Sequence, residues 1–92
     1  MSNYSRGADF ERAVMADLTA QGFGCIRSAG SHGAVDVMAF KPGEHWAIQC
    51  KINGKMGPDE RRKLVAFALI ADMKPIKAWR PKRGQIRYEE VQ

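Results

Sequence analysis

The sequence has no run of 18 apolar residues, only two cysteines, and no repeat, low-complexity tract or linker. Without such a run we expect no membrane-spanning helix, and the polar stretch at residues 1–11 does not resemble a secretory signal. Cys25 and Cys50 lack metal-ligand spacing, and two cysteines cannot form a disulfide framework. Both fall in predicted strands, where cysteine behaves as a small buried hydrophobe. We therefore expect a protein of the reducing cytoplasm.

What the sequence does contain is enough apolar material for one small core and an excess of positive charge. The chain has 92 residues, 45% of them hydrophobic, which predicts a single folded domain over residues 1–92. Fifteen Lys and Arg face ten Asp and Glu, a net charge of +5. That charge on so small a surface indicates a polyanionic partner, although a generic basic protein has the same composition.

Periodicity predicts an α/β fold. Residues 5–21 carry Phe10, Val14 and Leu18 at four-residue spacing and are followed by Gly22, which is typical of an amphipathic helix and its end. The other expected elements are strands at 24–28, 35–40 and 45–52, a helix at about 58–73, and strands at 74–79 and 85–91. The order αβββαββ predicts a mixed sheet with a helix on each side.

Two of these segments have defined contacts. The turn at 41–44 should join the second and third strands in a hairpin. The second helix has Pro58 at its first position. We expect that helix to bury Leu64, Val65, Phe67, Ala68 and Ala71.

Polar residues interrupt the predicted core strands. Asp36 is the one acid in an apolar strand, and a buried unpaired carboxylate is costly, so it needs a partner, a metal or a cleft. In the neighbouring strand, Gln49 and Lys51 lie on the face opposite the apolar residues. If the strands pair, Glu11 of the first helix can approach the same point. Two carboxylates and an amide oxygen suit Mg²⁺, and a lysine beside them would offset charge on a phosphoryl group.

Each of these residues also has an ordinary explanation. Gln49 and Lys51 alternate as on the solvated face of an edge strand. Glu11 is a common residue early in a helix, and Asp36 has fifteen basic residues with which to pair. Spacing alone leaves the phosphodiesterase centre and these structural explanations both open.

Three segments together add a resemblance. "RGADFERAVMADLTAQGFGCIRSAGS", "VDVMA" and "AIQCK" resemble the archaeal-type Holliday junction resolvases of the PD-(D/E)XK nuclease superfamily, closely over about residues 6–52. The resemblance implies a restriction-endonuclease-like core. It also implies Glu11 as the helical acid, Asp36 as the central metal ligand, Lys51 as the catalytic lysine and Ser31 as an assisting loop serine. Arg12 and Arg27 match residues that contact DNA or organise the site.

The sequence departs from this family at one position, where Gln49 replaces the usual glutamate. An amide oxygen can bind Mg²⁺ but brings no negative charge, so the substitution puts metal affinity in doubt. Glutamine occurs at this position in other branches of the superfamily, including Mrr-like nucleases. A weakly active or purely DNA-binding version of the fold therefore stays open.

From these observations we expect a DNA endonuclease that cuts four-way junctions, uses Mg²⁺ or alternatively Mn²⁺, and works in the cytoplasm with the nucleoid or in a host cell if viral. Gln49 and the main-chain carbonyl of Cys50 would complete the metal ligands of Asp36 and Glu11. The residues expected on DNA are Arg6, Arg12, Arg27, Arg61, Arg62, Lys82 and Arg83. Two opposed cuts favour a homodimer, for which Met56, Met73, Ile76 and Trp79 offer apolar surface. The alternatives are an Mrr-like or repair nuclease and a noncatalytic DNA-binding module.

Overall fold

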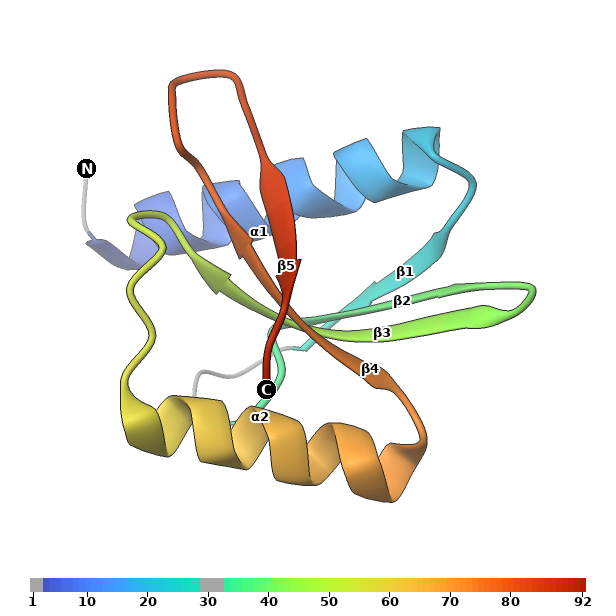
Figure 1. Ribbon diagram of the computed structural model, residues 1–92. Coiled ribbons are helices and arrows are strands. Elements are labelled where there is room, and N and C mark those ends of the chain that lie inside the picture. Colours follow the sequence, from blue (N-terminus) through green and yellow to red (C-terminus); the bar gives the residue numbers. More distant parts are fainter. Residues whose placement is uncertain (1–2, 29–32) are drawn as a thin grey trace.

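The computed structural model describes residues 3–28 and 33–92, and its elements follow the predicted order αβββαββ (Figure 1). They are α1 (Asn3–Ala20), β1 (Gly24–Arg27), β2 (Val37–Lys41), β3 (Glu44–Lys51), α2 (Pro58–Ala71), β4 (Lys74–Trp79) and β5 (Arg87–Glu90). None of the helices in this described part is long and apolar enough to cross a membrane.

The five strands form one mixed sheet in which neighbours in sequence are also neighbours in space. Three pairs are antiparallel, including the predicted β2–β3 hairpin with Val37 opposite Ile48. Strands β3 and β4 are parallel, and a parallel pair needs a crossover, which α2 supplies. The end of β3 therefore leads directly through the loop at 52–57 into α2.

The helices lie on opposite faces of the sheet, so the core has two layers (Figure 1). The layer under α1 consists of Phe10, Val14, Leu18, Phe23, Val37, Ala39, Ile48, Ile76 and Ala78. The layer under α2 is smaller and consists of Val35, Ala47, Leu64 and Ala68. Trp46, Ile48, Cys50 and Ile52 all belong to the α1 side and Ala47 to the α2 side, as the alternation in β3 predicts.

The first helix forms as its periodicity predicts. Phe10, Val14 and Leu18 are almost completely buried. Gly22 has φ +95°, a left-handed conformation that favours glycine, and the Phe23 N–H donates to the Leu18 carbonyl at 3.0 Å. This end turns the chain back onto the sheet as β1.

Some predicted boundaries were wrong by one to two residues. Strand β2 begins at Val37 rather than at residue 35, so Asp36 lies just before it. The Asp36 N–H still donates to the Ile48 carbonyl at 2.8 Å. The Cys50 N–H, however, donates to the Asp36 side chain, so regular strand pairing begins only at Val37. Helix α2 ends at Ala71 because Asp72 adopts φ 56°. Strand β5 is limited to Arg87–Glu90.

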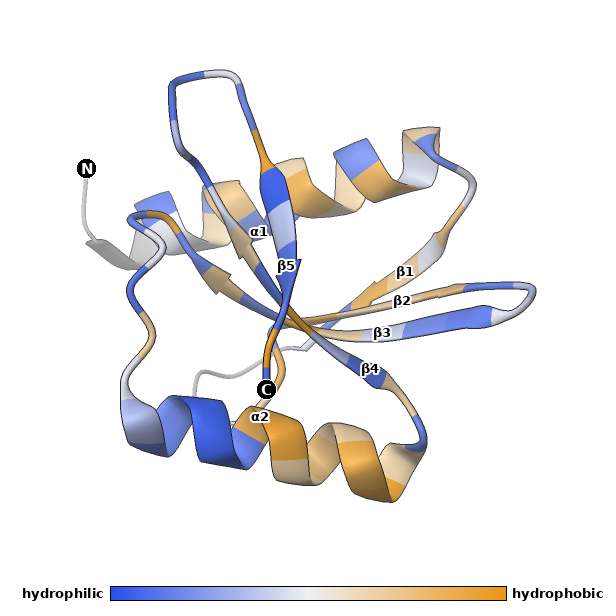
Figure 2. Cartoon of the chain, viewed as in Figure 1, coloured by the Kyte–Doolittle hydropathy of each residue, from blue (hydrophilic) through white to orange (hydrophobic). Residues whose placement is uncertain are grey.

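The buried face predicted for α2 was partly wrong. Leu64 and Ala68 are fully buried and Val65 is partly buried, but Phe67 is 39% exposed and Ala71 is exposed as well. Met38, Met56, Met73 and Val91 pack against this layer, so side chains from outside the helix cover part of it. The C-terminal half of α2 is rich in apolar residues (Figure 2). Two of them are highly exposed, Leu69 at 81% and Ile70 at 87%.

Candidate active site at the end of strand β3

The predicted polar residues meet near the end of β3, between the two helices. Lys51 is the last residue of β3, Asp36 immediately precedes β2, and Glu11 reaches the site from α1. Glu60, in the first turn of α2, approaches as well. Glu11, Lys51 and Glu60 all act electrostatically on the Asp36 carboxyl group, and we refer to these four residues as the charged cluster.

Asp36 is held by the backbone of the neighbouring strand. Its Oδ2 accepts a hydrogen bond of 2.9 Å from the Cys50 N–H. Burial is the main cause that raises the Asp36 pKa; the Cys50 hydrogen bond opposes the increase, and the negative charges of Glu11 and Glu60 add to it. The carboxylate therefore lies in an environment that disfavours its charge and that a cation would relieve.

Glu11 is fixed by Arg27 of β1. The Arg27 Nε donates to Glu11 Oε1 at 2.8 Å, and both side chains are largely buried. Arg27 thus holds the Glu11 side chain in one orientation, which is compatible with the organising role that the family resemblance implies.

Lys51 forms an ion pair with Glu60, a contact that the sequence did not predict. Glu60 Oε1 also accepts from the Gly57 N–H at 3.1 Å, so the carboxylate is anchored to the start of its own helix. The hydrogen bond from Lys51 is the main cause that lowers the Glu60 pKa. A glutamate three residues after Gly57, next to Pro58, is a capping signature. That signature agrees with the predicted helix start at Pro58, but it does not indicate the pairing with Lys51.

Gln49 lies on β3 beside this cluster and is partly exposed. Within the described part of the chain, its amide group has no hydrogen-bond partner, so its oxygen is available as a ligand. Cys50 contributes its N–H to Asp36, and its thiol is kept neutral because burial and the nearby Asp36 carboxylate raise its pKa. Ser31, predicted to assist catalysis, lies outside the described residues.

The donor set fits a hard divalent cation that keeps part of its water shell. Among residues 3–28 and 33–92, no three His, Cys, Asp or Glu side chains are grouped so that they could enclose a metal. Two carboxylates and one amide oxygen are an incomplete set, which is typical of Mg²⁺ sites that leave positions for water and substrate phosphate. The Asp36 carboxylate, whose charge is disfavoured by partial burial and by the charges of Glu11 and Glu60, is the group whose charge a cation would offset.

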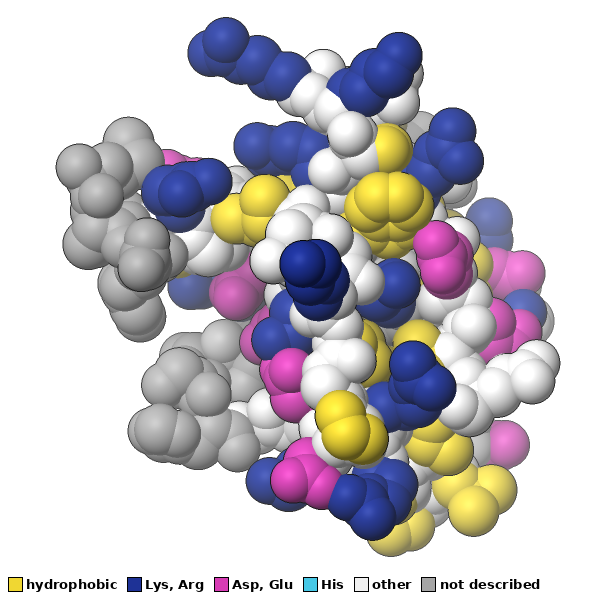
Figure 3. All heavy atoms as spheres, turned by 60° about the vertical axis from the view of Figure 1, so that its left-hand side comes forward, with side chains coloured by type: hydrophobic (Ala, Val, Ile, Leu, Met, Phe, Trp, Pro, Cys, Tyr) yellow, Lys and Arg dark blue, Asp and Glu magenta, His cyan; other side chains and the backbone are white. Residues whose placement is uncertain are grey.

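The predicted DNA-contacting residues fall into two groups. Arg12 and Arg62 are exposed but pair with Asp9 and Asp59 of their own helices. The others besides Arg27 are exposed and make no ion pair with any described residue; they are Arg6, Arg61, Lys82 and Arg83. Figure 3 shows Lys and Arg side chains over the face that carries the β3–α2 loop and the β4–β5 turn. A basic surface therefore lies on the side of the molecule where β3 ends and α2 begins, the side that carries the charged cluster.

Comparison with known proteins gives one consistent family. A family model described as archaeal Holliday junction resolvase (Hjc) matches residues 2–92. The crossover junction endodeoxyribonuclease Hjc of Methanocaldococcus jannaschii is 38% identical over 76 residues, which cover 78% of this chain and 56% of the relative. The chain thus spans just over half the length of this curated relative. The structure of the Holliday junction resolvase Hjc of Archaeoglobus fulgidus superimposes with a TM-score of 0.83 and 30% identity, covering 95% of this chain and 74% of that one.

Proposed function

Because the chain belongs to the archaeal Holliday junction resolvase family, we propose that it is a divalent-metal-dependent DNA endonuclease that resolves four-way junctions. The observation that carries this proposal is the cluster of Asp36, Glu11 and Lys51 at the end of β3. A partly buried acid, a second acid and a lysine are groups that metal-dependent phosphodiester hydrolysis uses. We also propose that residues 1–92 act as a single nuclease domain.

Each residue has a defined task in this proposal. Asp36, Glu11 and Gln49 would hold a magnesium ion, with the Cys50 carbonyl as a further ligand, and Mn²⁺ is the alternative metal. The chemistry that such an ion supplies when bound is polarisation of the phosphate and a lowered pKa of a water molecule. Lys51 offsets the negative charge that develops on the phosphate. Glu60 holds the Lys51 ammonium group in place before DNA binds.

The substrate we propose is a junction recognised by its shape. The exposed basic residues contact phosphates, which position DNA but carry no base information. Resolution requires two cuts in opposed strands, and one chain has one candidate centre. We therefore propose a homodimer with two-fold symmetry.

The test is cleavage of a four-way junction and of a linear duplex of the same sequence, with Mg²⁺ and with chelator. Paired cuts in the junction alone, only with Mg²⁺, support the proposal. Asp36→Ala should abolish cleavage and leave junction affinity within a few fold, because a metal ligand is lost and the basic surface stays. If Asp36→Ala cuts at the wild-type rate, the metal assignment is wrong.

Because Gln49 replaces the usual glutamate of the family, two alternative functions stay open, and the same experiment distinguishes them. Equal cleavage of linear duplex would indicate an Mrr-like or repair nuclease instead. Metal-independent binding without any cleavage would indicate a DNA-binding module that has kept the fold, because the amide supplies one charge fewer than glutamate.

A further inference from the structure

A groove adjoins the charged cluster at Lys51. It has a volume of about 410 Å³ and lies between the start of α1 and the β3–α2 loop. Its lining is Arg6, Gly7, Cys50, Lys51, Ile52, Asn53 and Lys55. Lys51 is shared by the groove and the charged cluster, so a DNA strand whose phosphate reaches Lys51 can continue along this groove.

The loop that forms one wall is held by several contacts. The Asn53 Oδ1 accepts from the Lys55 N–H at 3.0 Å, and the Ile52 carbonyl accepts from the Arg80 N–H at 3.2 Å. Gly54 has φ +76°, and the ring of Trp79 occupies the space where its Cβ would be. This wall is thus built before any ligand arrives, which reduces the ordering cost of binding.

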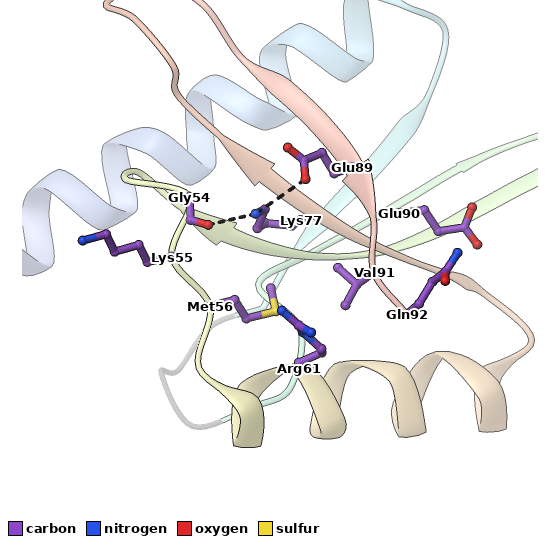
Figure 4. Close-up of a pocket in the computed structure, with 9 residues that line it drawn as sticks. All are labelled: Gly54, Lys55, Met56, Arg61, Lys77, Glu89, Glu90, Val91 and Gln92. Atoms are coloured by element: carbon purple, nitrogen blue, oxygen red, sulfur yellow. Dashed lines mark hydrogen bonds and ion pairs between the residues drawn. The ribbon is translucent and has the colours of Figure 1, made fainter.

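Lys77 secures the same loop from β4. Its Nζ donates to the Gly54 carbonyl at 2.8 Å and pairs with Glu89 at 3.6 Å. Figure 4 shows Lys77 between these two partners, whereas Lys55 points to the other side of the loop. Lys77 is therefore committed to the structure, and Lys55 is the lysine that this loop presents to a ligand.

The charges of the groove are available for a polyanion. Arg6 and Lys55 are exposed, and neither makes an ion pair with a residue in the described part of the chain. Lys51, which also lines the groove, is already paired with Glu60. Among the described residues, no acid lines the groove. Two uncompensated cations, Arg6 on α1 and Lys55 on the preformed loop wall, beside the proposed catalytic lysine are suited to the phosphates of a nucleic-acid backbone.

We infer that this groove is a second phosphate-binding subsite, which holds the sugar–phosphate backbone of the cut strand beside the phosphate at Lys51. Arg6 and Lys55 each neutralise one phosphate there, and Asn53 shapes the turn that places Lys55. The inference rests on the proposed nuclease function. It adds Lys55 and Asn53, which neither the sequence pattern nor the family resemblance indicated.

The experiment compares Arg6→Ala, Lys55→Ala and the double variant with Lys74→Ala. Lys74 is an exposed lysine without an ion pair among the described residues, at the opposite end of β4, so it removes the same charge away from the groove. All four carry Asp36→Ala, and junction binding is measured without metal between about 50 and 200 mM salt. The slope of log affinity against log salt is negative, and each lost phosphate contact should make it shallower by about 0.9. The double variant should show nearly twice that change.

The Lys74→Ala slope should match that of the parent, and Lys55→Arg should restore the parent slope. Equal slopes for the double variant and Lys74→Ala would overturn the subsite, even if the active protein cuts junctions normally. The converse result is separable: if binding depends on Arg6 and Lys55 but junctions with Mg²⁺ stay uncut, the subsite stands and the nuclease proposal fails. No junction binding by the parent would refute both.

Discussion

At the scale of single residues, Asp36 combines a cost to folding with a role in the site. Its pKa is raised mainly by burial, and the acids Glu11 and Glu60 add to the increase. A carboxyl group whose pKa is higher in the folded than in the unfolded state destabilises the fold once it ionises, and the cost disappears as pH falls through the folded pKa. The metal-free protein should thus be less stable at neutral pH than its packing allows.

Asp36→Asn should therefore raise Tm in chelator at pH 7, by roughly the few degrees that about 1 kcal/mol produces in a domain of this size. The asparagine oxygen can still accept from the Cys50 N–H, so the fold keeps that contact. The gain should shrink as pH is lowered, because the wild-type carboxyl group becomes neutral too. Thermal scans at several pH values measure it. A lower Tm for Asp36→Asn at pH 7 would contradict the argument.

Gln49→Glu tests the departure of this chain from its family. An added anionic ligand at a hard cation strengthens binding, since affinity depends on the charge of the ligands. The Mg²⁺ concentration for half-maximal cleavage should fall by about tenfold, which corresponds to roughly 1.4 kcal/mol. A matched control is Gln85→Glu, which adds the same charge in the exposed β4–β5 turn. An unchanged titration would place Gln49 outside the metal ligands.

The sequence predicted some of these residues and missed others for physical reasons. Asp36 and Lys51 were identifiable because a charged residue in an apolar strand is an anomaly visible in the sequence alone. Glu60 was not, because an acid in a first helical turn is common and its partner depends on how α2 approaches β3. Lys55 lies in a loop, where no periodicity indicates direction. Its exposure on the groove follows from tertiary contacts at Gly54 and Trp79.

At the scale of elements, the order and type of every helix and strand followed from periodicity and turn residues. The face of α2 did not. Periodicity indicates a broad apolar stripe on this helix, but it cannot show that Met56 and Met73, outside the helix, fill part of the layer beneath it. Apolar content in a helix thus predicts burial only if nothing else competes for the same surface.

The loop between β3 and α2 makes a testable contribution to stability. Gly54→Ala introduces a Cβ 2.9 Å from the Trp79 ring, in addition to the strain of φ +76°. Gly43→Ala, in the β2–β3 turn, has a similar φ of +80° and no atom within 4 Å of the new Cβ, so it isolates the backbone strain. We expect Gly43→Ala to destabilise by about 1 kcal/mol and Gly54→Ala by roughly 1–3 kcal/mol more. Urea unfolding measures both, and equal losses would mean that Trp79 moves away freely.

At the scale of the whole molecule, the apolar surface that a dimer could use differs from the one expected. Ile76 is buried, Met56 and Met73 pack against the α2-side core, and the Trp79 ring packs against Gly54, so none of them is surplus. The exposed large hydrophobic residues on α2 are instead Phe67, Leu69 and Ile70. They lie within four consecutive positions of one helix, and exposed apolar surface gathered in this way on a small protein is a candidate interaction surface. The second helix thus remains the proposed interface, through a different set of side chains.

The exposed side chains of α2 predict a dimer that charged substitutions should disrupt. Light scattering at micromolar concentration should give about twice the chain mass of 10.3 kDa. Changing Leu69 and Ile70 together to lysine should give the single-chain mass, because two buried charges oppose the contact. Ile26→Lys, which alters a residue that is 55% exposed on β1, should leave the dimer intact.

The same dimer has a functional consequence. Mixing wild type with Asp36→Ala should yield heterodimers that nick one strand of a junction and leave the opposed strand whole, since each cut needs its own Asp36. The Leu69→Lys, Ile70→Lys variant should bind junctions more weakly and lose coupling between the two cuts. Its Glu11, Asp36 and Lys51 should stay in place, because they belong to α1, to the residue before β2 and to the end of β3, and not to the exposed face of α2. A wild-type monomer that makes paired cuts in one binding event would refute the symmetric model.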